Sequence, residues 1–529
     1  MRALRLRWHR VRVIARDNGP VSSAVPSPPR PGPPLLRRFD ARPWTWRLLG
    51  AALLAASASV ILRRYLVDHP DEIWQVDLEV YREGARSLVE GRPVYDWLTD
   101  APQYLPFTYP PFGALVGTPL LLVPFGVAGW LWSLLQVVLL WVATGLAFRP
   151  LLERAGARAG LAQGAVAAVL MQLQPLQEGI RFGQVNSIIV TLCLADVARR
   201  RVGWWPRGSL AGLATAVKLT PAVFWIHWAV TRQWRVLAAS VLTAASVTAV
   251  TGLFAPSATA AYWSDALLDP GRLGPNDGTS NQSIRGVLLR LGPSEGPLLT
   301  VTWVLLVAVV AVVGFRLSAR LHRLGEPVAV VATVGLVAFL VSPVSWVHHL
   351  HWGIVVLGAL VGDGRNLRRV ALAALGTVVL YARIPHTGFN WTLSQDAWRA
   401  ALGPFVEQAY CWWALVALAA MWWFLARDDD RAGRDGDLAA GSHRGPGAQV
   451  EPDVEPDVDR GRDAGQNGVG APAAASRVRT ASTAHTPAPT LRMRDSRSRR
   501  SRARPSSAAT PDTTSSAVSD PANTETGSR

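Results

Sequence analysis

Long apolar segments, separated by short polar connections, fill most of the chain between residues 47 and 426. Half of the 529 residues are hydrophobic. About 20 apolar residues in a helix cover the ~30 Å hydrocarbon core of a bilayer. Within that core the backbone must satisfy its own hydrogen bonds, which favours helices. The sequence therefore predicts an all-α polytopic membrane protein.

The order of apolar and basic segments predicts how the chain crosses the membrane. Segment 111–124 is short and flanked by prolines, which favours a re-entrant or interfacial helix, and residues 208–231 fit two short helices folded at Lys218–Pro221. Spans are expected near 48–66 (an uncleaved anchor), 126–147, 162–178, a segment ending near 198, 234–255, 297–317, 326–344, 348–362, 367–383 and 405–426. Arginine clusters follow alternate spans, as the positive-inside bias requires. We expect about 11–12 transmembrane helices, cytoplasmic termini and an outer acid-rich loop, 67–110.

The two ends of the chain differ from its apolar middle. Residues 1–46 are basic and Pro-rich, and residues 427–529 are rich in Arg, Ser and Pro, without apolar periodicity. Both are predicted to be disordered and cytoplasmic, which leaves 47–426 as the membrane domain. The net charge of +17 follows from arginines in the tails and short loops, so no nucleic-acid partner is expected. The two cysteines, Cys193 and Cys411, lack metal-ligand spacing and imply no disulfide framework.

Four clusters of polar residues fall at the expected outer face. Ionisable groups at membrane depth are costly and usually mark a site or a water-filled cavity. The clusters therefore predict an enzyme that acts on a lipid-linked substrate at the bilayer surface. They are Asp77, Tyr81 and Tyr109; Gln184 and Asn186; Asn281, Gln282, Ser283 and Arg285; and Ser342, Ser345, Trp346, His348, His349 and His351.

Asp77 is the candidate catalytic residue because it follows the first span within D-L-E-V-Y. Glycosyl transfer needs a base that takes the proton of the acceptor hydroxyl, and a carboxylate suits that task. The alternative is that Asp77 is one of several solvated acids in the loop. Asp68, Asp71 and Asp96 are then the other candidates for the base.

Other residues are candidates for substrate binding. Lys218 is the only lysine of the chain and, with Arg181, could neutralise a lipid phosphate, unless it snorkels to the headgroups. Asn281, Gln282 and Arg285 could bind sugar hydroxyls or phosphate, or could cap a loop. Asn281-Gln282-Ser283 also matches a glycosylation pattern, which we interpret as accidental.

The run of histidines allows three interpretations. His348 and His349 could bind the donor, form part of an aromatic cluster at the interface, or ligate a metal. Adjacent histidines on a helix point to different faces, and no carboxylate or cysteine lies at a useful helical offset nearby. We therefore assign no metal site and no cofactor.

Seven sequence blocks, in order, resemble glycosyltransferase family 87, the polyprenol-phosphate-mannose-dependent mannosyltransferases of the GT-C superfamily. They cover residues 45–426. The blocks are D-L-E-V-Y (77–81), G-R-P-V-Y (91–95), Y-P-P-F (109–112), F-G-Q-V-N-S (182–187), G-L-A-T-A-V-K-L-T-P (212–221), N-Q-S-I-R-G (281–286) and S-P-V-S-W-V-H-H (342–349).

The resemblance implies a GT-C-type bundle with a large first extracytoplasmic loop and an inverting transfer from a polyprenyl-phosphate sugar. It places the catalytic carboxylate at Asp77 and suggests roles for Lys218 and for His348 or His349. Mannose in an α linkage such as α-1,2 is expected, with a glycolipid or cell-envelope glycan as acceptor. Three alternatives remain open: arabinofuranose as the sugar, a transporter or flippase, and a scaffold for envelope assembly without catalysis.

Overall fold

The computed structural model describes residues 43–68, 75–99, 104–198, 205–274, 276–292 and 295–426. All of them belong to one unit, Met1–Pro446. The expectations for residues 1–42 and for the tail 427–529 lie outside the described residues. Helices dominate the described part, which contains no β-strand and only two isolated bridges, Leu98 to Pro106 and Asn281 to Trp346. The prediction of an all-α polytopic membrane protein is confirmed.

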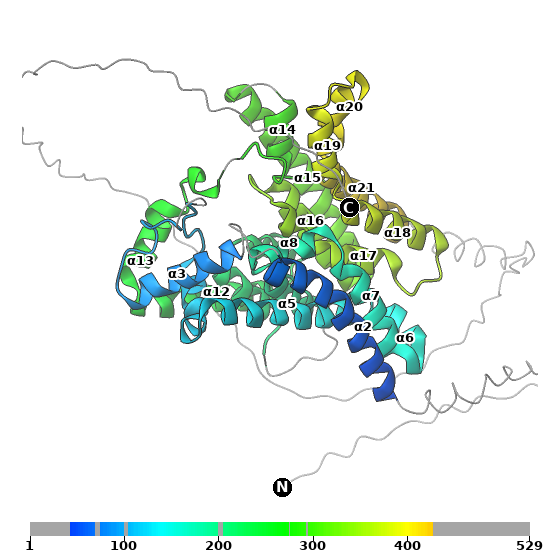
Figure 1. The fold of residues 1–529 in the computed structure, drawn as a ribbon, viewed down its shortest axis with the longest axis horizontal. Coiled ribbons are helices and arrows are strands. Elements are labelled where there is room, and N and C mark those ends of the chain that lie inside the picture. The colour runs from blue at the N-terminus through cyan, green and yellow to red at the C-terminus, as the bar shows by residue number, and fades with distance from the viewer. Residues whose placement is uncertain are drawn as a thin grey trace, which may run out of the picture. The chain divides into compact units, whose positions relative to one another are not determined.

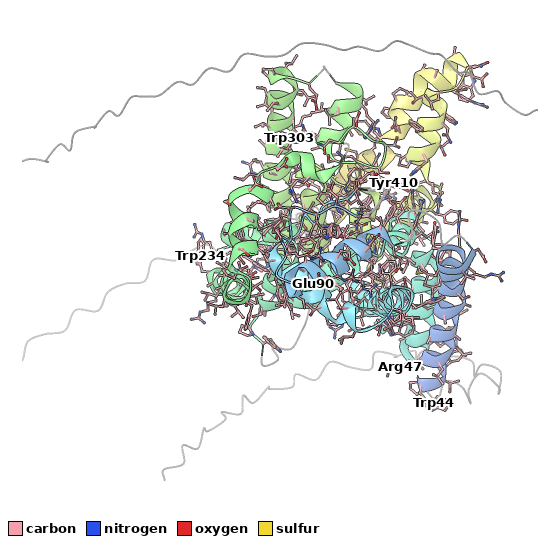
Figure 2. The ribbon with its side chains drawn as sticks, turned by 60° about the vertical axis from the view of Figure 1, so that its left-hand side comes forward. Trp44, Arg47, Glu90, Trp234, Trp303 and Tyr410 are labelled. Carbon is pink, nitrogen blue, oxygen red and sulfur yellow. The ribbon has the colours of Figure 1, made fainter. Side chains whose placement is uncertain are left out.

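Four helices are long and apolar enough to cross a bilayer. Many of their apolar side chains face outward, as at the C-terminal end of α12, where Leu253 and Phe254 are about four-fifths exposed. Such surfaces suit contact with lipid. Trp44 and Trp234 lie at the starts of two of these four helices (Figure 2). Tyr410, by contrast, is fully buried. The helices are α2 (Pro43–Arg63, continued by a π turn, Arg64–Asp68), α5 (Phe125–Ala147), α12 (Trp234–Phe254) and α15 (Pro297–Arg323).

Two further spans are bent instead of straight. Residues 149–171 form α6 (Arg149–Ala155), a 3₁₀ turn (Gly156–Arg158) and α7 (Ala159–Met171), and α8 (Gln174–Phe182) follows at 74°. Leu173 is extended and caps α8, and Pro175 lies in the first turn of that helix, where the missing N–H of proline costs no intrahelical hydrogen bond. At the other end of the domain, α20 (Ala397–Glu407) and α21 (Ala409–Leu425) meet at 53°.

The remaining helices are shorter, so the described residues contain four helices of spanning length, or six if each bent pair is one span, where the sequence led us to expect eleven or twelve. Helices still occupy every expected segment, because proline and glycine interrupt them without changing their apolar character. They are α3 (Val76–Val89), α4 (Pro111–Gly117) with a 3₁₀ turn (Thr118–Leu122), α9 (Asn186–Ala198), α10 (Ser209–Val217), a 3₁₀ turn (Thr220–Ala222), α11 (Val223–Val230), α13 (Pro256–Ala261), a π turn (Tyr262–Ala266), a 3₁₀ turn (Pro270–Leu273), α14 (Ile284–Leu291), α16 (Pro327–Val341), a 3₁₀ segment (Val347–Trp352), α17 (Gly353–Val361), α18 (Leu367–Tyr381) and α19 (Ile384–Thr392).

The helices α2 and α7 run alongside each other with their backbones in contact (Figure 1). A side chain added at Gly50 would lie 2.0 Å from the carbonyl oxygen of Gly160, and one added at Gly164 would lie 2.2 Å from the Cα atom of Gly50. Small residues allow this close approach between helices in membranes. The α2–α7 contact matters because α2 precedes the loop that carries Asp77, and α7 leads through α8 to Gln184.

Candidate functional site

Asp77 lies in the first turn of α3, an amphipathic helix of the first loop that the sequence had not predicted. The helix starts at Gln75, whose backbone is left-handed (φ 49°) and whose N–H donates to the carbonyl of Arg181 (2.8 Å). The Gln75 side chain also donates to the hydroxyl of Ser133 in α5 (2.7 Å). These bonds join the start of α3 to α5 and α8, and so fix where the Asp77 carboxylate stands.

Gln184 reaches Asp77 because the chain reverses sharply after α8. Gly183 has φ 72°, a left-handed conformation that glycine adopts without strain. A Cβ atom there would lie 2.6 Å from the Cβ of Leu78, so α3 packs directly on the turn. The Gln184 amide then donates to Asp77 Oδ2 at 2.6 Å.

A line of hydroxyl groups continues from Gln184 away from Asp77. The Tyr81 hydroxyl donates to Gln184 Oε1 (3.3 Å) and lies 3.0 Å from the Tyr109 hydroxyl. Since Tyr81 has one proton, Tyr109 is the donor in the second bond. Trp132, which the sequence had not singled out, donates from its indole to the Gln184 carbonyl (3.3 Å). We name Asp77, Tyr81, Tyr109 and Gln184 the carboxylate site.

The charge state of Asp77 is set by its surroundings. Burial raises the pKa of the Asp77 carboxyl to about 6, although the hydrogen bond from Gln184 and the charge of Lys218 both act to lower it. Its second oxygen, Oδ1, accepts no hydrogen bond from the described residues. The carboxylate is therefore held by one oxygen and is free to accept a proton on the other.

The candidate carboxylates Asp68 and Asp96 stand in different surroundings. Asp68 is exposed and pairs with Arg63 at 3.3 Å, and Asp96 is also exposed. Neither is held by a buried amide in the way that Gln184 holds Asp77. Asp71 lies outside the described residues.

Lys218 stands on the other side of Tyr109. It ends α10 in extended backbone just before Pro221, and its ammonium lies 5.3 Å from the centre of the Tyr109 ring. It donates to Asn186 Oδ1 (3.3 Å) and to His349 Nε2 (3.1 Å). An ammonium has three N–H donors and no acceptor, so one donor remains for a ligand. We name Asn186, Lys218 and His349 the lysine site.

A cavity of about 30 Å³ adjoins the lysine site, and Ser342 and Ser345 supply further polar groups to its lining. The Asn186 amide also donates to the His348 carbonyl (3.0 Å), which ties α9 to the histidine run. Both ring nitrogens of buried His348 lack a hydrogen-bond partner among the described residues, and the ring packs edge-on against Phe182 (5.6 Å between centres). His349, and not His348, thus contacts Lys218.

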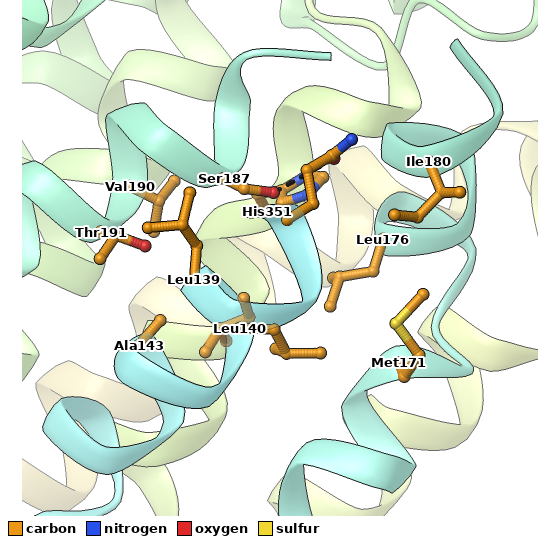
Figure 3. Close-up of a pocket in the computed structure, with 12 residues that line it drawn as sticks. Leu139, Leu140, Ala143, Met171, Leu176, Ile180, Ser187, Val190, Thr191 and His351 are labelled. Carbon is orange, nitrogen blue, oxygen red and sulfur yellow. Dashed lines mark hydrogen bonds between the residues drawn. The ribbon is translucent and has the colours of Figure 1, made fainter. Parts of the chain in front are cut away.

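His351 faces inward, toward a second and smaller pocket. Its Nδ1 lies 2.7 Å from the His348 carbonyl oxygen. Figure 3 shows His351 next to Ser187, above an apolar lining that includes Leu140, Leu176 and Met171. The pocket has a volume of about 10 Å³, which is close to the minimum that one water needs. It is therefore a packing defect and not a substrate site. The described residues include no group of three His, Cys, Asp or Glu arranged to hold a metal.

Asn281 and Gln282 are fully buried, and their side-chain amides are bonded to backbone groups. Asn281 Oδ1 accepts from the N–H groups of Ser283 (3.2 Å) and Ser345 (2.9 Å). Gln282 donates to the carbonyls of Thr279 and Glu407 and accepts from the Tyr410 N–H. The Asn281–Gln282 loop thus supports the segment that leads to the histidines. The geometry favours the loop-capping alternative for these two amides.

Arg285 and Arg181 complete the set of predicted residues. Arg285 lies in α14, 3.9 Å from Glu295. Arg181 lies at the end of α8, with its guanidinium over the Phe182 ring at 5.3 Å. Sequence reasoning missed the charged groups near Arg181, which include Glu178, Arg383 and His386. The available signal was the polar residues Gln174, Gln177 and Glu178, about one helical turn apart on α8, since polar residues inside an apolar pair of helices need partners.

Comparison with known proteins places this chain in a family. The model of glycosyltransferase family 87 matches residues 107–343. A protein of Mycolicibacterium smegmatis, named polyprenol-phosphate-mannose-dependent alpha-(1-2)-phosphatidylinositol mannoside mannosyltransferase, is 33% identical over 372 residues, covering 65% of this chain and 83% of the relative.

Two proteins of Mycobacterium tuberculosis give a similar result. One carries the same description and is 32% identical over 65% of this chain and 84% of its own length. The other is described as a pentamannoside mannosyltransferase, at 32% identity over 67% of this chain and 81% of its own length. No solved structure matches the chain significantly. From the family model and these relatives, the chain belongs to glycosyltransferase family 87 and is a membrane glycosyltransferase.

Proposed function

We propose that the protein transfers mannose from a polyprenyl-phosphate donor to a hydroxyl of a lipid-linked glycan, forming an α linkage such as α-1,2. The names of the relatives supply the donor and suggest a phosphatidylinositol mannoside as acceptor. The observation that carries the proposal is Asp77. Its carboxylate is held by Gln184 through one oxygen, keeps the other free and adjoins the lysine site.

The chemistry follows from these positions. The acceptor hydroxyl gives its proton to Asp77 Oδ1 while its oxygen attacks the anomeric carbon of the donor. The bond from that carbon to the phosphate oxygen breaks, and the phosphate leaves with the electron pair. Attack opposite to the leaving group inverts the anomeric centre. A phosphate is a good leaving group and needs no proton, so one carboxylate suffices.

The lysine site suits the phosphate of the donor. Negative charge grows on the leaving phosphate as the bond breaks, and a fixed cation stabilises that charge in a water-poor site. The free N–H donor of Lys218 supplies the contact, while Asn186 and His349 hold the ammonium in place. Tyr81, Tyr109 and Gln184 would line the path between Asp77 and Lys218.

The site is proposed to face the extracytoplasmic side, with both termini in the cytoplasm. Gln75 contacts Ser133 in the first half of α5, whereas Arg149 and Arg154 follow the end of that helix at Ala147. At 1.5 Å per residue, Ser133 and Ala147 are separated by on the order of 20 Å. Arginines favour the cytoplasmic side, so this separation supports an outer position for Asp77.

The test is transfer in membranes that contain the full-length chain. With radiolabelled polyprenyl-phosphate mannose and a phosphatidylinositol mannoside, we expect a mannosylated lipid sensitive to an α-1,2-mannosidase. Polyprenyl-phosphate arabinofuranose should not replace the donor. Transfer of arabinofuranose, or of no sugar, would refute the proposal. Labelling of a cysteine introduced at position 68 from outside intact cells tests the orientation separately, and exclusive labelling from inside would reverse it.

A further inference from the structure

A second polar region lies along α8, beyond the carboxylate site. The side-chain amide nitrogen of Gln174 donates to buried Glu178 (2.6 Å) and bonds to His386 Nδ1 (3.2 Å). The side-chain oxygen Oε1 of Gln174 accepts from the Tyr410 hydroxyl (2.5 Å). One turn further, Gln177 accepts from Arg383 at 2.8 Å. These bonds attach the start of α19, where Arg383 and His386 stand, to the face of α8.

Three basic groups on this face, Arg181, Arg383 and His386, form what we call the basic patch. Arg181 and Arg383 are partly exposed and His386 is exposed. Neither arginine makes an ion pair within the described residues. The bonds of Arg383 to Gln177 and to the Tyr65 hydroxyl (2.9 Å) use only Nη2. Guanidinium donors therefore remain for an anion, and Arg binds phosphate in a bidentate manner.

The acids near the basic patch do not cancel its charge. Glu178 is buried and takes a hydrogen bond from Gln174. Glu407 is also buried, accepts from the Thr279 hydroxyl (2.6 Å) and lies 3.7 Å from Arg290. Glu407 lies near a cation outside the patch, so Glu178 is the acid that faces the two arginines and the histidine of the patch. The patch is positive when Glu178 is charged, and more so when it is protonated.

An apolar groove of about 350 Å³ begins beside the basic patch. It runs between α18 and α21, and its lining includes Leu372, Val379, Ile384, Phe405, Trp412 and Val416. Ile384 is the residue after Arg383, so one end of the groove adjoins the patch. From Leu372 to Val379 the groove follows α18 for on the order of 10 Å. A cationic group at the end of an apolar groove is complementary to a phospholipid, which has a phosphate headgroup and an apolar acyl chain.

We propose that the basic patch binds the phosphodiester of the lipid acceptor and that the groove holds one of its acyl chains. The inference rests on the proposed function, since it names the acceptor's place in the same reaction. The donor is excluded by chemistry: its phosphate is bonded to the reacting carbon and must lie next to Asp77. Gln177 lies within α8, whereas Gln184 follows the turn at Gly183, and the hydrogen bonds of Arg383 and His386 go to Tyr65, Gln177 and Gln174. The patch is thus separate from the lysine site, and a phosphate held by Arg383 and His386 belongs to the other substrate, whose glycan spans the interval.

The experiment measures lipid binding without transfer. Full-length protein in lipid nanodiscs is irradiated with phosphatidylinositol that carries a photoreactive acyl chain, and adducts are located by mass spectrometry. We expect adducts on groove residues such as Leu375 and Val416. The double variant Arg181→Gln/Arg383→Gln should lower labelling roughly tenfold or more, as loss of charged hydrogen bonds implies. Val379→Trp, which fills the groove, should abolish it.

Matched controls separate the site from general effects on the membrane domain. Val378→Trp changes the neighbouring residue on the exposed face of α18. Arg399→Gln removes an exposed arginine that pairs with Asp396 in α20. Both control variants should be photolabelled to the same extent as the wild-type protein. Equal labelling by a diacylglycerol with the same acyl chain, which lacks the phosphodiester, would overturn the role of the basic patch. Displacement by polyprenyl phosphate would assign the groove to the donor instead.

Kinetics distinguish failure of this inference from failure of the proposed function. With saturating donor, the double variant should raise the acceptor KM while leaving kcat and the donor KM unchanged. A wild-type protein that transfers mannose without labelling in the groove overturns the acceptor site alone. A wild-type protein that labels in the groove but transfers no mannose overturns the proposed function and keeps the lipid site.

Discussion

Gln184 and Gln282 lie in two regions that look alike in the sequence but differ in what their amides contact. Gln184 bonds to the Asp77 carboxylate and the Tyr81 hydroxyl, both of which are side chains. Gln282 bonds to the carbonyls of Thr279 and Glu407 and to the Tyr410 N–H, all of which are backbone groups. A side-chain amide that is bonded to backbone groups fixes the path of a loop. One that is bonded to an ionisable side chain changes the position and the pKa of that side chain.

The same contrast holds for the neighbouring asparagines. Asn186 accepts from Lys218, so it takes part in placing a charge. Asn281 uses both of its amide groups on the backbone around residues 276, 283, 343 and 345. Substitutions in the two regions should therefore separate chemistry from stability, and four experiments test that separation in order of their expected effect on turnover.

The largest effect is expected for Asp77→Asn. The substitution keeps the size of the side chain but removes the proton acceptor, and loss of a general base costs about 10²–10⁴-fold in rate. We expect turnover to fall at least ~100-fold, with donor binding retained. Steady-state kinetics in membranes measure this. Asp68→Asn and Asp96→Asn are the controls and should stay close to wild type; near-normal turnover of Asp77→Asn would remove it from the mechanism.

The next effect is expected at Lys218, where charge and shape can be separated. Lys218→Met should lower kcat/KM for the donor by roughly 10–100-fold, because hydrogen bonds to a charged group contribute about 1.5–3 kcal/mol. Lys218→Arg keeps the charge and should lose less. The comparison uses donor titrations at saturating acceptor. Equal, wild-type behaviour of both variants would mean that the lysine does not contact the phosphate.

A smaller effect, seen mainly in the pH profile, is expected for Gln184→Leu. The pKa of the Asp77 carboxyl is raised to about 6 by burial, and the Gln184 bond opposes that rise. A base works in its deprotonated form, so activity should fall as the pH drops through about 6. Without the bond the pKa rises further, and the acid limb of kcat/KM should move to higher pH. Gln163→Leu, in which an amide bonded only to the Trp141 carbonyl is lost, should leave the limb in place.

The smallest effect on turnover is expected for Asn281→Ala. The substitution leaves buried backbone groups near Ser283 and Ser345 without partners, and each such group costs about 1–3 kcal/mol. We expect lower thermal stability in detergent and less folded protein, but an unchanged kcat per folded molecule. A variant that is as stable as wild type yet transfers slowly would place Asn281 among the substrate contacts after all.

The sequence predicted the fold class and the family, because apolar length and ordered motifs are local properties. It also predicted Asp77, Tyr81, Tyr109, Gln184 and Asn186 at one membrane face. In the structure the Gln184 amide donates to Asp77, and Asn186 accepts from Lys218, which the sequence had treated separately. Their catalytic roles stay predictions. The α3 helix was not anticipated, and its start depends on hydrogen bonds from Gln75 to the distant residues Ser133 and Arg181. The bend between α7 and α8 was not anticipated either, although Pro175 marks its position in the sequence.

Which side-chain amides are bonded to the backbone could not be predicted from a single sequence either. Whether Asn281 is free or bonded depends on the backbone path of residues 342–346, which no motif encodes. The basic patch was missed for a similar reason: Arg383 and Arg181 are 202 positions apart in the chain and are brought together only by the bonds of Gln174 and Gln177 across α8.

The backbone contact between α2 and α7 has a consequence for how the protein tolerates different membranes. Spans adjust to bilayer thickness mainly by tilting. With no side chains between Gly50 and Gly164 to compress or rearrange, these two helices must tilt as one body. One leads toward Asp77 and the other toward Gln184, so a thinner or thicker bilayer moves both partners of the 2.6 Å bond together. We therefore expect the alignment of Asp77 and Gln184 to depend less on bilayer thickness than contacts between helices that are held apart by side chains.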